Sequence, residues 1–274
     1  MTRSRLGSPA THRTATQVWR PSPLLGSEVM FGNLVDHQFA PHEHDTWSIG
    51  WVISGANHFR RERQHHTAPA GTVCVVNPSE VHTGGSDRMS YWSVMPSSAL
   101  LELAFPHASA DDLLTVRPVL QEAAALEAAQ QLFNVETMKA CALSLQGAAV
   151  DMLHAVLGQG PRLLVAEPPA SGLTVNRAMQ YLHDKLDRNV SLTELSEACG
   201  VSAFSLCREF AARLGMSPGA WVRSRRIARA QVLLRRGTEL CTAATQCGFS
   251  DQAHMTRLFR SVIGCTPAEW QRAA

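Results

Sequence analysis

Several features that mark other classes of protein are missing from this sequence of 274 residues. None of its 7 cysteines forms a Cys-x-x-Cys pair, the spacing typical of zinc and thiol-redox sites. No run of about 18 apolar residues is present, so we expect no membrane-spanning helix. The first residues are polar and basic without an apolar core, so we expect no secretory signal. We therefore expect a cytoplasmic protein whose thiols are reduced and mostly buried.

Charged residues make up only 18% of the chain, and their two signs are unevenly distributed. Residues 174–274 contain 14 Lys and Arg against 8 Asp and Glu, a net charge of +6. Residues 1–173 contain 11 against 15, a net charge of −4. A basic C-terminal third on a mildly acidic body indicates a polyanionic partner for that third.

Composition divides the chain into four segments. Residues 1–27 are rich in Ser, Thr, Arg and Pro, and we expect a partly disordered N-terminal arm. Residues 28–157 contain short β-like segments followed by helical ones. Residues 158–173 hold three Pro and three Gly, so we interpret them as a linker. Residues 174–273 have a helical pattern throughout.

The N-terminal domain begins with β-branched and aromatic segments separated by Gly- and Pro-containing turn signals. Many short strands at this spacing predict a small barrel or sandwich. We expect the strands at 34–39, 46–53, 57–63, 72–76 and 90–95, with turns at Ala40-Pro41, Ser54-Gly55, Ala70-Gly71, Asn77-Pro78 and Gly84-Gly85. Ala- and Leu-rich helices are expected at 118–133 and 136–157. Their apolar face packs on the barrel or pairs with a second subunit.

The C-terminal third contains one short motif twice. Each copy holds Cys-Gly-x-Ser, an apolar residue, Arg and Phe two residues apart, Gly, then Ser or Thr before Pro, and finally Trp. The offset is 48 residues at first and 49 from Leu206 and Met255 onward. The copies consist of Cys199, Gly200, Ser202, Leu206, Arg208, Phe210, Gly215, Ser217, Pro218 and Trp221, and of Cys247, Gly248, Ser250, Met255, Arg257, Phe259, Gly264, Thr266, Pro267 and Trp270.

Each copy is typical of a helix, a tight turn and a second helix. We expect seven helices in this third, with Ser191 and Glu194 forming a capping box and Pro218 opening a long connecting helix. A single such pattern often means only two packed helices. Because caps, turns and core positions recur together, we favour DNA binding, with one helix of each copy in a major groove.

Residues 174–273 resemble the DNA-binding domain of AraC/XylS-type transcription regulators, most specifically over 247–260 and 264–270. By this resemblance the base-contacting residues fall on Phe204, Cys207 and Arg208 in the first copy. In the second copy they fall on Gln252, Ala253, His254, Thr256 and Arg257. The wider DNA-binding set adds Ser202, Ser250 and Arg260. Cys207 and Ala253 donate little to a base, so we expect readout to rest on Arg208, Gln252 and Arg257.

The N-terminal domain resembles, more weakly, the cupin-like sensor domain of many AraC-type regulators. His42 and His44 lie two apart on a strand, which places both on one face, and His82 follows another strand. Metal-binding cupins supply a Glu where this chain has Ser48 or Ile49. We therefore expect no metal and no cofactor, and interpret the histidines as structuring the barrel or bonding a polar ligand.

Trp47 and Trp51 also share a strand face, either in the core or as a wall of an effector pocket. Our candidate effector-binding residues are His42, His44, Trp47, Trp51 and His82. No catalytic residue is expected.

Together these patterns predict an α+β two-domain protein. The N-terminal part is a cupin-like β-barrel with trailing helices, and the C-terminal part is an all-α seven-helix domain with two helix-turn-helix units. We expect a sequence-specific transcription regulator that responds to a small-molecule effector. The resemblance also implies promoter DNA, RNA polymerase and a second copy of the chain as partners, and participation of the N-terminal arm.

Two alternatives stay open. One is a metal-dependent cupin enzyme with a DNA-binding appendage, and the other is a thiol redox or alkylation switch. Neither explains the repeat. Because the two copies differ at their exposed residues, we expect an asymmetric DNA site. The second copy is richer in hydrogen-bonding side chains, so more direct base readout is expected from it.

Overall fold

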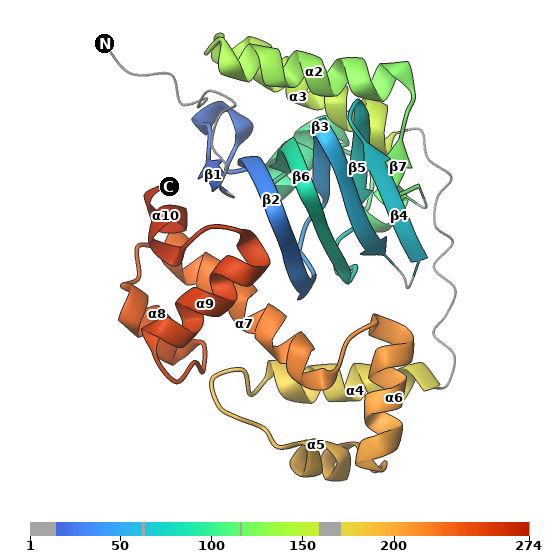
Figure 1. Ribbon diagram of the computed structural model, residues 1–274, viewed down its shortest axis with the longest axis vertical. Coiled ribbons are helices and arrows are strands. Elements are labelled where there is room, and N and C mark those ends of the chain that lie inside the picture. Colours follow the sequence, from blue (N-terminus) through green and yellow to red (C-terminus); the bar gives the residue numbers. More distant parts are fainter. Residues whose placement is uncertain (1–14, 62–63, 116, 159–170, 274) are drawn as a thin grey trace.

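The computed structural model describes residues 15–61, 64–115, 117–158 and 171–273, which form a β-domain and a helical domain (Figure 1). The β-domain has one antiparallel sheet and three α-helices that cover it. Its strands are β1 (Ala15–Trp19), β2 (Glu28–His42), β3 (Ser48–Arg61), β4 (Gln64–Pro69), β5 (Thr72–Val76), β6 (His82–Met95) and β7 (Val119–Leu120). Its helices are α1 (Ser98–Ala104), α2 (Ala123–Thr137) and α3 (Ala142–Leu157), with short 3-10 turns η1 (Ser22–Leu24) and η2 (Ala110–Leu113).

The sheet has the strand order β1-β2-β6-β3-β5-β7, and β4 pairs with β3. Two segments that the sequence separated at Ser54-Gly55 form the single strand β3, with a register shift at that place. The expected turn at Gly84-Gly85 is wrong, because both glycines lie inside β6. A Cβ on Gly85 would meet the Gln38 side chain at 2.4 Å, so this glycine allows a close approach between strands.

The expected turn at Ala40-Pro41 is also part of a strand. Both residues lie near the end of β2, where the β2–β6 register shifts between Phe39 and His42. Proline has no N–H to donate to a ladder, and such residues occur at bulges. After this register shift the pairing with β6 resumes at His42.

Part of the expected N-terminal arm belongs to the sheet. Ala15–Trp19 pairs with β2 in antiparallel register, and Trp19 donates from its Nε1 to Glu136 of α2 at 2.6 Å. The arm prediction is therefore wrong for this segment, because the edge of β2 and the covering helices offer it backbone and side-chain partners. Residues 1–14, and residues 159–170 of the expected linker, lie outside the described residues.

The two faces of the sheet bury different side chains, because successive residues of a strand point to opposite sides. Ile49 of β3 and both Trp92 and Val94 of β6 pack against α1–α3 in the main core. This core includes Leu153 and Val156 of α3, so most of that helix's apolar face packs on the sheet. Leu143, at the beginning of α3, is 79% exposed.

The helical domain has the seven helices that the sequence predicted. They are α4 (Ser171–His183), α5 (Leu192–Cys199), α6 (Ala203–Leu214), α7 (Pro218–Arg235), α8 (Leu240–Gln246), α9 (Gln252–Ile263) and α10 (Pro267–Arg272). Ser191 caps α5 by accepting from the Glu194 amide. The expected capping box is only half formed, because the Glu194 carboxylate bonds Arg188 and Tyr181.

Two hydrophobic cores hold the helical domain together, and α7 is shared between them. Its beginning contributes Trp221 to a core with Leu206 and Phe210 of α6. Its end contributes Leu234 to a core with Phe259 of α9. The repeat therefore corresponds to two packed units, α5–α6 and α8–α9, which we call the first unit and the second unit.

Most cysteines are inaccessible, and each is free in the described chain. Burial raises the pKa of Cys74 to about 12 and that of Cys247 to about 11, which keeps both as unreactive thiols. Cys199 and Cys265 are buried as well, Cys207 is half-buried, and Cys141 and Cys241 are exposed. Within the described part of the chain, no helix combines the length and apolar character needed to cross a bilayer.

Candidate DNA-reading helices and sensor pocket

The α6 helix presents an exposed face opposite a buried one. Leu206 and Phe210 are fully buried, and the N-cap Ser202 accepts from the Ser205 amide. Phe204 is 76% exposed, and the Arg208 guanidinium lies 5.9 Å from the centroid of its ring. A large apolar side chain and a cation thus stand together at the beginning of the helix. Cys207 is only half-buried on the same side.

The α9 helix repeats this arrangement with different exposed side chains. Met255 and Phe259 are fully buried, whereas Gln252, Ala253 and Arg257 are exposed. The extra residue of the second copy is Asp251, which takes over as N-cap and accepts from the His254 amide at 2.7 Å. Ser250, the counterpart of Ser202, lies 3.0 Å from the Nδ1 of His254 instead, and Thr256 and Arg260 follow along the helix.

Three arginines of α7 bond other parts of the protein. Arg226 is buried and donates to the carbonyl oxygens of Leu186 and Arg188, each at 2.8 Å, so it fixes the loop after α4. Arg225 donates to Asp45 at 2.6 Å and to Glu43 at 3.3 Å. Arg235 donates to Glu28 at 2.6 Å. These three arginines therefore serve the fold and the contact with the β-domain, whereas Arg223 and Arg229 are exposed.

A cavity of about 110 Å³ lies on the sheet face that is turned away from α1–α3. Strands β2, β3, β5 and β6 line it, mostly with apolar side chains. Val262 and Ile263 of α9 also line it, so the second unit contributes to the wall of a pocket in the β-domain. Its other lining residues include Met30, Phe39, Ser48, Asn57, Phe59, Cys74, Met89, Tyr91 and Met95.

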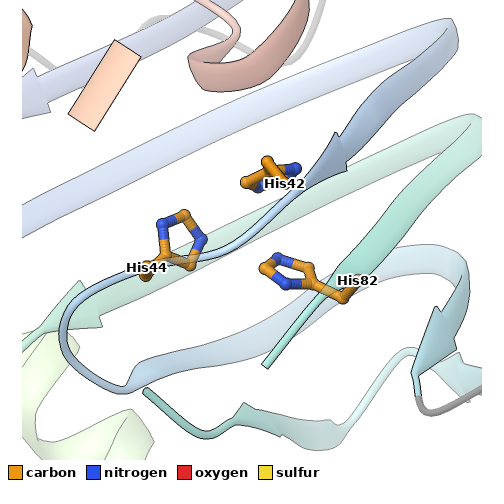
Figure 2. Close-up of side chains that lie close together, drawn as sticks. All are labelled: His42, His44 and His82. Atoms are coloured by element: carbon orange, nitrogen blue, oxygen red, sulfur yellow. The ribbon is translucent and has the colours of Figure 1, made fainter. Parts of the chain in front are cut away.

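The three predicted histidines come together in this pocket (Figure 2). His42 ends β2, His82 begins β6, and the two are opposite each other in the register. His44 follows in the loop after β2. The ring centroids are 4.2 Å apart for His42 and His82, and 5.0 Å apart for His44 and His82. These residues are the part of the candidate effector site that the structure assembles.

Trp47 and Trp51 do not belong to that site. Trp47 is 3% exposed in the core beneath the helices, and Trp51 makes an edge-to-face contact with Phe133 of α2, with centroids 5.4 Å apart. Their assignment as effector-binding residues is wrong. The odd-numbered residues of this stretch face α2 and α3, whereas Ser48 and Gly50 face the cavity.

Sequence reasoning missed the side chains that join the two domains. Glu43 is buried on the face opposite to His42 and His44, where its amide donates to Ser224 at 3.3 Å. Burial raises the pKa of its carboxyl, and the nearby Arg225 counteracts this rise. The alternation His-Glu-His-Asp over residues 42–45 could have indicated this contact. In an extended segment it places two imidazoles on one side and two carboxylates on the other.

Comparisons with known proteins agree with this architecture. The family described as AraC-like ligand binding domain matches residues 24–149, and a helix-turn-helix domain family matches residues 195–273. The uncharacterized HTH-type transcriptional regulator YbfI of Bacillus subtilis is 26% identical over 88% of this chain and 90% of its own. The HTH-type transcriptional activator RhaS of Enterobacter is 24% identical over 84% and 87%.

Solved structures show the same two-domain fold. An apo single-residue variant of ToxT from Vibrio cholerae aligns with a TM-score of 0.54 over 90% of this chain and 97% of its own, at 13% identity. Fold and site thus define a regulator that joins a ligand-binding β-domain to a DNA-binding helical domain. The chain belongs to the AraC family of transcription regulators.

Proposed function

We propose that one chain reads an asymmetric promoter site with α6 and α9 in successive major grooves. The observation that carries this proposal is the pair of capped helices with buried backs and exposed, unlike faces. In the first unit Arg208 is the side chain suited to a guanine edge, and in the second Gln252 and Arg257 suit adenine and guanine. For Ser202, Ser250 and Arg260 the proposal is contact with DNA phosphates.

A small-molecule effector occupies the pocket of the β-domain in this proposal. Because Val262 and Ile263 of α9 line that pocket, a bound effector acts on the back of the second unit and shifts its orientation toward DNA. The protein works as a homodimer in the cytoplasm and communicates with RNA polymerase. It is a regulator without enzymatic activity, as the relatives' descriptions as transcription regulators support.

The experiment compares Arg208→Ala and Arg257→Ala in binding to the promoter and to variants with single base-pair changes. Each substitution should cost about 1–3 kcal/mol on the native site and should relax specificity at one base pair. Arg229→Ala is the matched control, because this exposed arginine lies on α7, away from the reading faces. Binding is measured at fixed salt concentration, since phosphate contacts depend on it.

A uniform loss of affinity across all base-pair variants would mean that these two arginines contact phosphate. Equal losses for the control and the reading-helix variants would contradict the assignment of α6 and α9 as the reading helices. Native-like circular dichroism of each variant excludes unfolding as the cause.

A further inference from the structure

Three imidazoles converge at one end of the pocket. The β2–β6 register places His42 opposite His82, and His44 reaches the same side two residues later. Each ring offers one nitrogen such that all three nitrogens lie within 4.8 Å of one another. Figure 2 shows the three rings grouped beside the ends of the two strands.

Two of the rings are held in the tautomer that binds metal. The Nδ1 of His42 lies 2.7 Å from the carbonyl oxygen of Ala40, and the Nδ1 of His82 lies 3.1 Å from that of Glu80. A carbonyl oxygen only accepts, so each Nδ1 carries the hydrogen and each Nε2 keeps its lone pair. Histidine ligands in metal sites are oriented by such bonds from the other ring nitrogen.

Burial lowers the pKa of all three rings, and the positive charge of Arg61 lowers that of His82 further. Burial lowers the pKa of His42 to about 4 and that of His44 to about 3, so both are unprotonated near neutral pH. The neighbouring carboxylates are engaged elsewhere, Glu43 with Arg225 and Glu80 with Arg61. Ser48 lines the cavity where metal-binding cupins place a carboxylate. That difference led us to expect no metal from the sequence, but the three imidazoles lie close enough to form a ligand set without a carboxylate.

We propose that His42, His44 and His82 bind one divalent late-transition-metal ion of the zinc type, with the fourth coordination position facing the cavity. Three imidazoles with one open position are an established ligand set for such ions. Bonds of about 2.0–2.1 Å to a tetrahedral ion bring ligand nitrogens to about 3.4 Å from one another. The rings therefore rotate inward on binding. The chemistry supplied is Lewis acidity toward a ligand atom in the cavity.

The same segment connects the ion to the DNA-binding domain. Residues 42–45 alternate between imidazoles in the pocket and carboxylates that bond Arg225 of α7. Moving His42 and His44 toward an ion therefore moves the residues that hold α7. The idea that the ion is the effector rests on the proposed function. The idea that it binds at the three histidines is independent of that function.

The test titrates Zn²⁺ into the metal-free full-length protein by calorimetry and measures bound zinc after equilibrium dialysis. One equivalent per chain is expected, and His44→Gln should weaken binding by at least about 100-fold. His82→Gln is the second variant, and His58→Gln, at an exposed strand position, is the matched control that should bind like the wild type. Thermal unfolding without metal verifies that each variant is folded.

Co²⁺ substitution then reports the ligands. Imidazole coordination should give visible d–d bands without the thiolate charge-transfer band that Cys ligands produce. No stoichiometric Zn²⁺ binding, unchanged binding in both His44→Gln and His82→Gln, or a thiolate band would overturn the proposal. These assays contain no DNA, so their failure is distinct from a failure of promoter binding, which is measured separately.

Discussion

The two helix-turn-helix units have the same scaffold but different neighbours. The core of the first unit meets the β-domain through the partly buried Val81, and Arg60 donates to the Gly215 carbonyl at 3.4 Å. The core of the second unit continues into the β-domain through Met30 and Met95. Figure 1 shows α9 and α10 beside β1 and β2, with α6 lying away from those two strands.

This difference extends to the glycines that end the helices. A Cβ on Gly264, after α9, would meet the hydroxyl of Thr16 at 2.8 Å, whereas nothing lies within 4 Å of one on Gly215 after α6. Both have positive φ, so both satisfy a helix end. Only at Gly264 does the sheet approach so closely that a Cβ would not fit. The second unit therefore packs more closely on the sheet, and its α9 lines the pocket through Val262 and Ile263.

The largest expected effect separates the two cores. Phe259→Ala and Phe210→Ala each remove a fully buried ring and should each cost about 3–5 kcal/mol of unfolding free energy. Because the core around Phe259 includes β-domain residues, Phe259→Ala should also shift the unfolding of the β-domain. Urea unfolding followed by far-UV circular dichroism measures the loss of stability of each variant. Hydrogen exchange of the sheet amides then shows whether the β-domain is affected. Identical exchange in the sheet for both variants would refute the difference between the units.

An intermediate effect is expected at the polar contacts. Arg225→Ala leaves the Glu43 carboxylate, 4% exposed, without its cation, and should cost about 1–3 kcal/mol of unfolding free energy. Arg60→Ala removes one long hydrogen bond and should cost about 0.5–1.5 kcal/mol. Adding Glu43→Gln to Arg225→Ala should recover part of the loss, since the buried charge disappears. The comparison fails if the Arg60 variant is the less stable one in urea unfolding.

The smallest effect concerns the ion pair between Arg188 and Glu194, which has a carboxylate on α5 of the first unit. Hydrogen bonds from Arg188 and then Tyr181 lower the pKa of the half-buried Glu194 carboxyl to about 2. The folded pKa lies below the unfolded value of 4.5, so this stabilisation is present above that value and is lost as pH falls toward 2. The corresponding position of the second copy is Thr242, which has no charge.

The Glu194→Gln variant should therefore be less stable than the wild type at about pH 7. This difference in unfolding free energy should shrink as the solution is acidified to about pH 3. Urea unfolding at the two pH values measures this, with Thr242→Ala as the pH-independent control. A gap that stays constant with pH would show that the carboxylate contributes nothing through its charge.

Local signals made the helical domain predictable. Ser and Thr caps, Gly200 and Gly264 at helix ends, and the apolar spacing of α6 and α9 all act within a few residues, and the seven helices follow them. The β-domain was less predictable, because turn signals such as Gly84-Gly85 also occur where strands approach closely. The strand pattern also placed Trp47 and Trp51 on one face of the sheet. It did not show that α2 and α3 cover that face and that the cavity lies on the other.

The sequence by itself determined the family, the helices α6 and α9 and the presence of a β-domain before them, because repeated caps and periodicities are local properties of the chain. Only the tertiary structure decided that α9 lines the pocket, that Arg225 bonds Glu43, and that His82 stands opposite His42. These contacts join residues far apart in the chain, and strand register and domain packing, which no local pattern encodes, bring them together.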